Sequence, residues 1–326
     1  MEPASVLSIR GLTTVFKTDL GVARAVDKLD LEIPARATLG IVGESGCGKS
    51  TVGLSIMKLI PSPPGRITEG ELRFEGQDLL RLSNRAMRRI RGRRISMIFQ
   101  EPMTSLNPVR RVGETIIEVI SLHYGLSRKE ARKRALEALE NIRLPEPEIR
   151  INDYPHEMSG GMRQRIMIAL AICCQPELII ADEPTTALDV TIQAQILSLL
   201  GRIQKETGTS IVLITHDLGV IAENADQVAV MYAGQLVEYA DTPSLFQKPL
   251  HPYTQGLMLS VPRPGGGGKK KHRLTVIPGS VPNLLKVPPG CRFASRCSVA
   301  FQRCYEEEPA LIEQPGGRTV RCWRYA

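Results

Sequence analysis

The sequence predicts an α/β fold with a parallel sheet at its core, and three short, mostly apolar runs carry this prediction. The runs are residues 38–42, 178–181 and 211–214. The first is followed by a glycine-rich turn and a periodic helical segment at 51–59, and the third opens another strand–helix unit. Helical material is inserted between these distant strands, which is typical of α/β proteins.

Periodicity predicts two further subdomains. Residues 5–35 alternate apolar and polar side chains, which indicates short antiparallel strands around a loop at 17–24. Residues 112–143 have helical periodicity with prolines beyond them, and the helical pattern continues through 166–171. We therefore expect an antiparallel β subdomain and, at about 101–170, a helical subdomain.

Composition changes near the end of this core. We expect one large domain at 1–262, because the following residues, 263–274, contain a run of four glycines and three lysines that cannot pack. This segment is interpreted as a flexible linker. Residues 275–326 are rich in proline and cysteine and form a small C-terminal extension.

Composition and charge restrict the class of protein. The 326 residues are 42% hydrophobic, enough for a large core. The sequence contains no run of about 18 apolar residues and its start has no signal-peptide pattern, so we expect a cytosolic chain. A net charge of +8 is compatible with nucleotide, acidic lipid or nucleic acid and selects none of them.

A phosphate-binding motif follows the first apolar run. The pattern GxxxxGK[ST] lies between a strand and a helix, where its backbone N–H groups and the helix N-terminus bind phosphates. Lys49 would neutralise the β- and γ-phosphates, and the Ser50 hydroxyl would bind Mg²⁺. The motif comprises Gly43, Glu44, Ser45, Gly46, Cys47, Gly48, Lys49 and Ser50, and we include Thr51 among the ATP-binding residues.

Two adjacent carboxylates end the second apolar run. Asp182 lies at the position where a P-loop enzyme holds Mg²⁺, and Glu183 is placed to polarise the attacking water. The alternative is that both merely cap a strand. The phosphate-binding motif on the same chain favours the catalytic interpretation.

A third motif identifies a family. Residues 158–165 read Met-Ser-Gly-Gly-Met-Arg-Gln-Arg, and this segment resembles the signature of ABC ATPases. The resemblance implies that Ser159, Gly160 and Gly161 open a helix and contact the γ-phosphate of an ATP held by a partner subunit. Such a helix N-terminus suits phosphate binding.

Other positions match the same family one by one. Gln100 resembles the Q-loop glutamine, an Mg²⁺ ligand, and Asp189 resembles the D-loop aspartate of residues 187–189. His216 resembles the switch histidine that senses the γ-phosphate. Phe16, which we expect in a loop, resembles the aromatic residue that stacks on adenine, with ordinary packing as the alternative.

Two segments narrow the resemblance. Residues 100–108 and 251–254 resemble the dipeptide/oligopeptide/nickel importer branch of the ABC proteins. The resemblance implies a second ATPase subunit, commonly a different chain, together with two membrane permease subunits and an extracytoplasmic solute-binding protein. It places this chain at the cytoplasmic face of the membrane and implies no nucleic acid partner. Peptides are the expected solute, with nickel or another small solute as an alternative. A soluble ABC ATPase acting on nucleic acid machinery is a further alternative.

Four cysteines in the C-terminal extension form a candidate metal site. Their spacings of five, six and seventeen residues are wider than those of ordinary zinc pairs and leave the metal open. The resemblance to peptide-importer ATPases implies a [4Fe–4S] cluster, with zinc, or free or disulfide-bonded thiols, as alternatives. The four are Cys291, Cys297, Cys304 and Cys322.

Overall fold

The computed structural model describes residues 5–100, 106–186, 188–260 and 277–326, and these divide into two compact units. Each unit combines segments that are distant in the sequence. Unit 1 comprises Met1–Leu7, Ile33–Thr38 and Phe74–Ile214, and unit 2 comprises Ser8–Glu32, Leu39–Arg73 and Thr215–Ala326.

The sheet of unit 1 consists of three parallel strands in the order β6, β7, β8. β6 spans Ile95–Ile98, β7 spans Leu178–Asp182 and β8 spans Ser210–Thr215, and all three are buried along their whole length. A strand that is buried on both faces requires a continuous apolar run instead of an alternating one. The apolar runs of the sequence therefore predicted β7 and β8 to within one or two residues.

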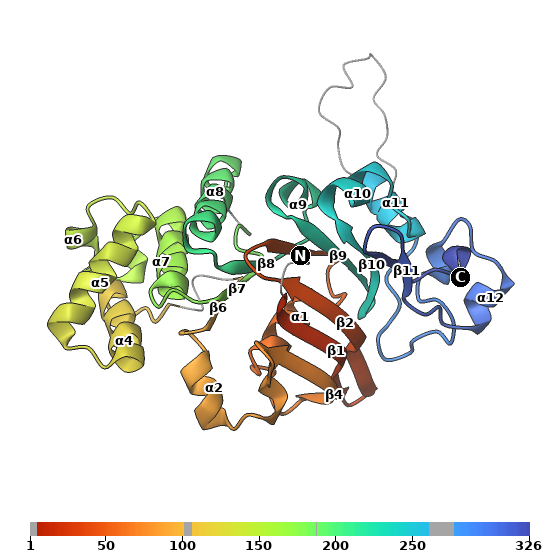
Figure 1. Ribbon diagram of the computed structural model, residues 1–326, viewed down its shortest axis with the longest axis horizontal. Coiled ribbons are helices and arrows are strands. Elements are labelled where there is room, and N and C mark those ends of the chain that lie inside the picture. Colours follow the sequence, from red (N-terminus) through yellow and green to blue (C-terminus); the bar gives the residue numbers. More distant parts are fainter. Residues whose placement is uncertain (1–4, 101–105, 187, 261–276) are drawn as a thin grey trace, which may run out of the picture. The chain divides into compact units, whose positions relative to one another are not determined.

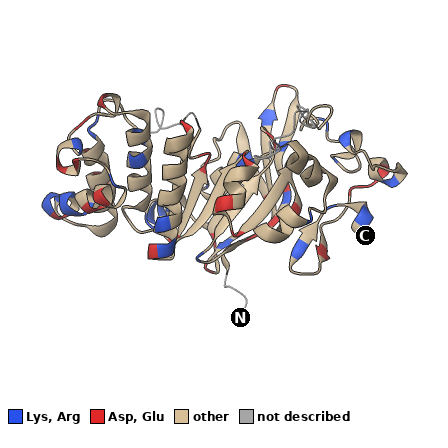
Figure 2. Cartoon of the chain, turned by 90° about the horizontal axis from the view of Figure 1, so that it is seen from above, with Lys and Arg blue, Asp and Glu red and all other residues tan. Residues whose placement is uncertain are grey.

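Helices form much of unit 1, and α4 to α7 are grouped together in Figure 1. The periodic segment at 112–143 is two helices, because Gly125 adopts a left-handed φ of 65° that ends α4, and Ser127 and Glu130 form a capping box that begins α5. Many Lys and Arg residues lie on these helices (Figure 2). The remaining elements are β5 (Gln77–Asp78), α2 (Asn84–Ile90), α4 (Val112–Tyr124), α5 (Arg128–Asn141), α6 (Pro147–Arg150), α7 (Gly160–Ile172) and α8 (Val190–Thr207).

Unit 2 contains a sheet in the order β11, β12, β10, β9, β3. β3 pairs with β9 in parallel, whereas β9, β10, β12 and β11 pair successively in antiparallel fashion. The last two strands of the chain therefore extend this sheet. The bounds are Thr38–Val42 for β3, Gln227–Tyr232 for β9, Gln235–Asp241 for β10, Ile312–Gln314 for β11 and Arg318–Val320 for β12.

Three further strands are neighbours in the order β2, β1, β4. β1 spans Ser5–Thr18, β2 spans Gly21–Pro34 and β4 spans Gly65–Phe74. The two-residue connection between β1 and β2 requires an antiparallel pair. The predicted loop at 17–24 was therefore too long. The two strands remain paired up to residues 18 and 21, but the residues at this end of the hairpin are exposed. They show no apolar alternation, so the sequence pattern did not mark them as strand.

The helices of unit 2 begin and end at local signals. α1 (Lys49–Ile56) starts two residues earlier and ends three residues earlier than the predicted 51–59. The segment after it is a turn in which the Leu59 N–H donates to the Leu54 carbonyl at 2.8 Å. Among the described helices none is both long and apolar enough to cross a membrane. The others are α9 (Leu218–Asn224), α10 (Thr242–Gln247), α11 (Pro252–Ser260) and α12 (Gln302–Glu306).

Candidate nucleotide-binding site

The glycine-rich motif forms the turn between β3 and α1 in unit 2. Gly48 caps the helix with a φ of 103°, a left-handed value that favours glycine, and a Cβ there would lie 2.1 Å from the Ala25 carbonyl oxygen. A Cβ on Gly43 would lie 2.2 Å from the Met231 carbonyl oxygen. Both glycines are therefore required by the close approach of neighbouring backbone.

Lys49 is held inside this loop. Its side chain is 5% exposed, and Nζ donates to the carbonyl oxygens of Gly43 at 2.8 Å and Glu44 at 3.1 Å. Ser45 and Gly46 are exposed, and Ser50 is half-buried at the start of α1. The loop thus presents an ammonium group, a hydroxyl and a helix N-terminus together, which is a site for the phosphates of a nucleotide.

Two residues outside the motif contact Glu44 and thereby support the phosphate-binding loop. The Glu44 N–H donates to the Tyr253 hydroxyl at 2.9 Å, and the Arg296 guanidinium pairs with the Glu44 carboxylate at 3.0 Å. Tyr253 lies in the segment 251–254, which carried only a family resemblance. No sequence signal marked Arg296 as a neighbour of residue 44, since 252 residues separate them.

Cys47 is the variable residue of the loop. Its side chain is buried, and burial raises the pKa of the thiol, with Lys49 opposing the shift. The thiol is therefore protonated near neutral pH.

The carboxylate pair lies at the end of β7 in unit 1. Asp182 is 5% exposed as the last residue of the strand. Glu183 follows it with a φ of 45°, a left-handed conformation that costs about 1–3 kcal/mol for a residue other than glycine. The Glu183 N–H donates to the Ile214 carbonyl at 2.9 Å, and this bond holds the turn in place.

Two polar side chains orient the Glu183 carboxylate. Gln100 Nε2 donates to Oε2 at 3.2 Å, and the Thr186 hydroxyl donates to the same oxygen at 3.0 Å. Gln100 and Glu183 were both predicted site residues, and the structure brings them together. Thr186 was missed, although it follows Glu183 by three residues.

The signature segment also forms the expected helix start. Ser159 caps α7, and its hydroxyl accepts from the Met162 N–H at 3.3 Å. Gly160 is exposed, and a Cβ on Gly161 would lie 3.1 Å from the Ile192 side chain of α8. Asp189 caps α8 by accepting from the Ile192 N–H at 2.9 Å. Residue 187 of the D-loop resemblance lies outside the described residues.

Phe16 and His216 both belong to unit 2. Phe16 lies on β1, half-exposed, instead of in a loop, and a Cβ on Gly65 would come within 2.8 Å of its ring. His216 follows β8 directly and is exposed, and Asp217 next to it caps α9. Thr51 lies in the first turn of α1.

The four C-terminal cysteines line one pocket in unit 2 together with His251 and Trp323. Burial raises the pKa of Cys291 to about 11 and also raises the pKa values of the Cys297 and Cys322 thiols. Among the described residues no three His, Cys, Asp or Glu side chains are arranged to hold one metal ion. The thiols therefore converge without the tight grouping of a single-ion site.

His251 packs beside this pocket and links it to the loop. Burial lowers the pKa of the imidazole to about 3, so it is neutral at pH 7. Its Nδ1 accepts from the Tyr253 N–H at 3.0 Å, and its ring lies 5.8 Å from that of Phe293. The Tyr253 ring is tilted against that of Tyr232 and meets that of Phe293 in a T-shaped contact, so aromatic packing connects the cysteine segment with the residue that supports Glu44.

Family comparisons agree with this geometry. A family model described as ABC transporter matches residues 26–186, and one described as oligopeptide/dipeptide transporter, C-terminal region, matches residues 237–304. Among solved structures, the dimeric bacterial ABC transporter cassette MJ0796 is 30% identical with a TM-score of 0.65 and covers 72% of this chain and 98% of its own. The cbiO1 protein from Clostridium perfringens, at 24% identity and a TM-score of 0.64, shares the fold.

Curated relatives cover nearly the whole chain. The probable peptide ABC transporter ATP-binding protein y4tR of Sinorhizobium fredii is 52% identical over 98% of this chain and 95% of its own length. The oligopeptide transport protein AppD and the dipeptide transport protein DppD of Bacillus subtilis are each 49% identical, over 99% and 98% of this chain and 97% and 94% of their own lengths. The chain therefore belongs to the ABC transporter ATP-binding proteins and is an ATPase of the group that carries the oligopeptide/dipeptide transporter C-terminal region.

Proposed function

We propose that this ATPase is the motor subunit of an ABC importer that takes up dipeptides or oligopeptides across the cytoplasmic membrane. The observation that carries the proposal is the presence on one chain of the phosphate-binding loop and the C-terminal region that the oligopeptide/dipeptide transporter family model matches. Three relatives that are about half identical to this chain are named for peptide transport, which supports peptides over nickel as the solute.

Most of the predicted residues have a proposed role in ATP hydrolysis. Lys49 and the loop N–H groups bind the β- and γ-phosphates, as their enclosure by the loop supports. Glu183 polarises the attacking water, while Gln100 holds its carboxylate in place. Mg²⁺, when bound, neutralises developing charge on the phosphates, and Ser50, Asp182 and Gln100 are its proposed ligands. Phe16 would stack on adenine, and His216 would contact the γ-phosphate.

The signature segment is proposed to act on a neighbouring subunit. Ser159, Gly160 and Gly161 sit at an accessible helix start, which suits them to contact an ATP held by a second ATPase chain. ATP binding would close the pair, and hydrolysis would reopen it. Two permease subunits and an extracytoplasmic solute-binding protein complete the proposed assembly, with this chain peripheral at the cytoplasmic face.

We further propose limits for the domains of the chain. The nucleotide-binding domain is assigned to 1–262, the linker to 263–274 and the extension to 275–326.

The extension is also proposed to hold a [4Fe–4S] cluster through Cys291, Cys297, Cys304 and Cys322. Support comes from the four thiols lining one pocket and from the resemblance of this segment to the peptide-importer ATPases, in which such cysteines would be thiolate ligands of the cluster.

The deciding experiment is ATPase stimulation in the complex recovered from detergent-solubilised membranes with this chain as bait. The complex is reconstituted and challenged with dipeptides, longer peptides and nickel. We expect peptides to stimulate hydrolysis and nickel to leave it unchanged. Stimulation by nickel alone would contradict the peptide assignment, and failure to recover any permease subunit would contradict the importer.

A further inference from the structure

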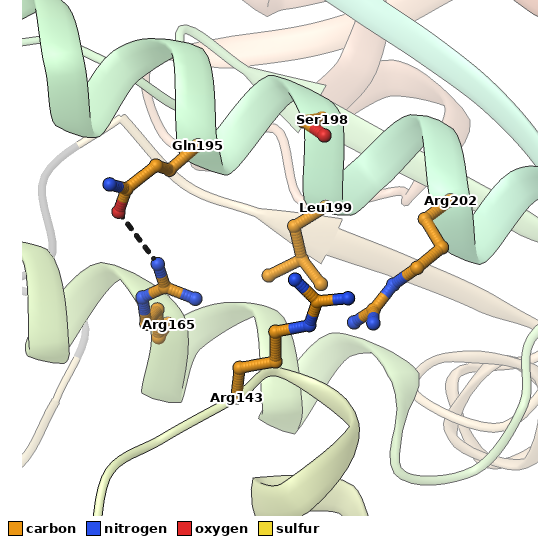
Figure 3. A pocket seen from close by; sticks show the side chains of 6 residues that line it. All are labelled: Arg143, Arg165, Gln195, Ser198, Leu199 and Arg202. Carbon is orange, nitrogen blue, oxygen red and sulfur yellow. Dashed lines mark hydrogen bonds between the residues drawn. The ribbon is translucent and has the colours of Figure 1, made fainter.

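A pocket in unit 1 gathers three arginines from three separate segments. Arg143 lies after α5, Arg165 lies on α7 and Arg202 lies on α8, and their guanidinium groups face the same space (Figure 3). Arg143 and Arg202 lie outside the nucleotide-binding motifs, and Arg165 ends the signature segment, four residues after Gly161. The rest of the lining is contributed by α8 and consists of Gln195, Ser198 and Leu199.

Neighbouring polar groups hold two of the guanidiniums in position. Arg165 donates to the Ile142 carbonyl at 2.7 Å and to Gln195 Oε1 at 2.9 Å. Arg202 donates to the Asn141 carbonyl. These acceptors are neutral, so they orient the guanidiniums without neutralising them. A guanidinium carries five N–H groups, which leaves donors for a ligand.

No carboxylate lines the pocket, and within the described part of the chain none of the three arginines forms an ion pair. Burial lowers the pKa of Arg165, and the charges of Arg143 and Arg202 lower it further. The cluster is thus a site of mutual repulsion that an anion would relieve. Elsewhere in unit 1 the arginines for which an ion pair with a carboxylate is described include Arg81, Arg94, Arg110, Arg128 and Arg150.

We propose that this pocket binds the phosphoryl group of a small soluble phosphate compound, a phosphomonoester or diphosphate, at a site separate from the ATP site. Three positive charges match a multivalent anion better than a chloride or a single carboxylate. The planar guanidiniums suit phosphate oxygens, and Gln195 and Ser198 supply further polar contacts at the rim. Arg143 is the exposed member of the three arginines that line the pocket.

The test measures pyrophosphate binding by titration calorimetry at 150 mM NaCl without magnesium. The full-length chain carries Lys49→Ala so that the phosphate-binding loop contributes little. We expect one pyrophosphate per chain, and at least about a tenfold rise in Kd for Arg143→Gln with Arg202→Gln, because each removes a charge-assisted contact. The matched control is Lys129→Gln with Lys133→Gln, two exposed residues of α5, for which we expect less than about a twofold change.

Several outcomes would overturn the proposal. The first is that the chain does not bind pyrophosphate. The second is that the arginine and lysine double variants raise the Kd for pyrophosphate equally, which would indicate general charge attraction. Vesicles of phosphatidylcholine with phosphatidic acid are the second probe, and binding to vesicles without binding to pyrophosphate would assign the pocket to lipid headgroups instead. If the arginine double variant does not fold, Arg143→Gln alone serves, because its side chain is exposed, and an unchanged Kd there would also overturn the proposal.

Discussion

At the scale of single residues, the proposed catalytic carboxylate shows how backbone and side chain are positioned together. Glu183 adopts a left-handed backbone conformation at the end of a buried strand, and its carboxylate accepts from Gln100 and Thr186. Left-handed residues other than glycine persist only where surrounding contacts hold them. Here the bond from its N–H to the Ile214 carbonyl does so.

The first prediction concerns this carboxylate. Glu183→Gln keeps the size of the side chain but removes the charge that polarises water, so we expect ATP binding to persist while kcat falls by about 10²- to 10⁴-fold. Steady-state hydrolysis and equilibrium nucleotide binding measure the two effects. Glu206→Gln, an exposed carboxylate on α8, is the control. Turnover at the wild-type rate would refute the assigned role.

The second prediction concerns the buried lysine of the loop. Lys49→Ala removes the ammonium group that Gly43 and Glu44 hold in place, so the Kd for ATP should rise by at least about tenfold. Lys17→Ala, an exposed lysine of unit 2, controls for the loss of one charge. Fluorescent nucleotide binding gives the comparison, and equal affinities in the two variants would contradict the phosphate role.

At the scale of elements, the C-terminal segment is built into unit 2 by strand pairing and by buried charge. β12 pairs with β10, and Arg318 pairs at 3.1 Å with Glu238, which is fully buried and also accepts the N–H groups of Leu250 and His251. Arg292 pairs with Asp27 of β2, and both side chains are at most 5% exposed. Residues near the end of the chain thus stabilise its beginning.

The third prediction tests this buried ion pair. Asp27→Asn removes the buried carboxylate that pairs with Arg292 and leaves only a contact of 4.0 Å with the more exposed Glu308. The free energy of unfolding should therefore fall by about 3–5 kcal/mol. The control is Arg73→Gln, which breaks an exposed pair with Glu71 and should cost at most about 1 kcal/mol. Urea unfolding of the full-length chain measures both. Equal losses would show that burial of the pair is not the cause.

At the scale of the whole molecule, the cysteine segment and the nucleotide loop share one packed region of unit 2. Tyr253 and Arg296 reach Glu44 from this side, and Arg296 is adjacent to Cys297. Loss of the cysteine segment should therefore disturb the loop as well as the segment itself.

The fourth prediction concerns the proposed cluster. Anaerobic purification should yield about four iron and four acid-labile sulfide per chain. Cys297→Ser should lose this content and unfold at lower temperature, because cluster binding contributes folding free energy. Cys173→Ser, a half-buried thiol outside the pocket, should keep it. Iron-free wild-type protein from an anaerobic preparation would count against the cluster.

Local chemistry was predictable from the sequence. A buried parallel strand needs a run of apolar residues, so β3, β7 and β8 were located closely, and the phosphate-binding motif specified Lys49 because its glycines are required by the turn itself. Phe16 was expected in a loop and lies on a strand, since hairpin hydrogen bonding extends past the residues whose pattern marks it.

Long-range contacts were decided only by the tertiary structure. The support of Glu44 by Arg296, the pairing of β12 with β10 and the meeting of Arg143, Arg165 and Arg202 join residues far apart in the chain. Periodicity and spacing report the surroundings of a residue along the chain, whereas these contacts depend on which surfaces meet after folding. The sequence by itself therefore determined the family, the nucleotide-binding loop and the core strands. Only the tertiary structure decided which distant residues contact and support that loop and those strands.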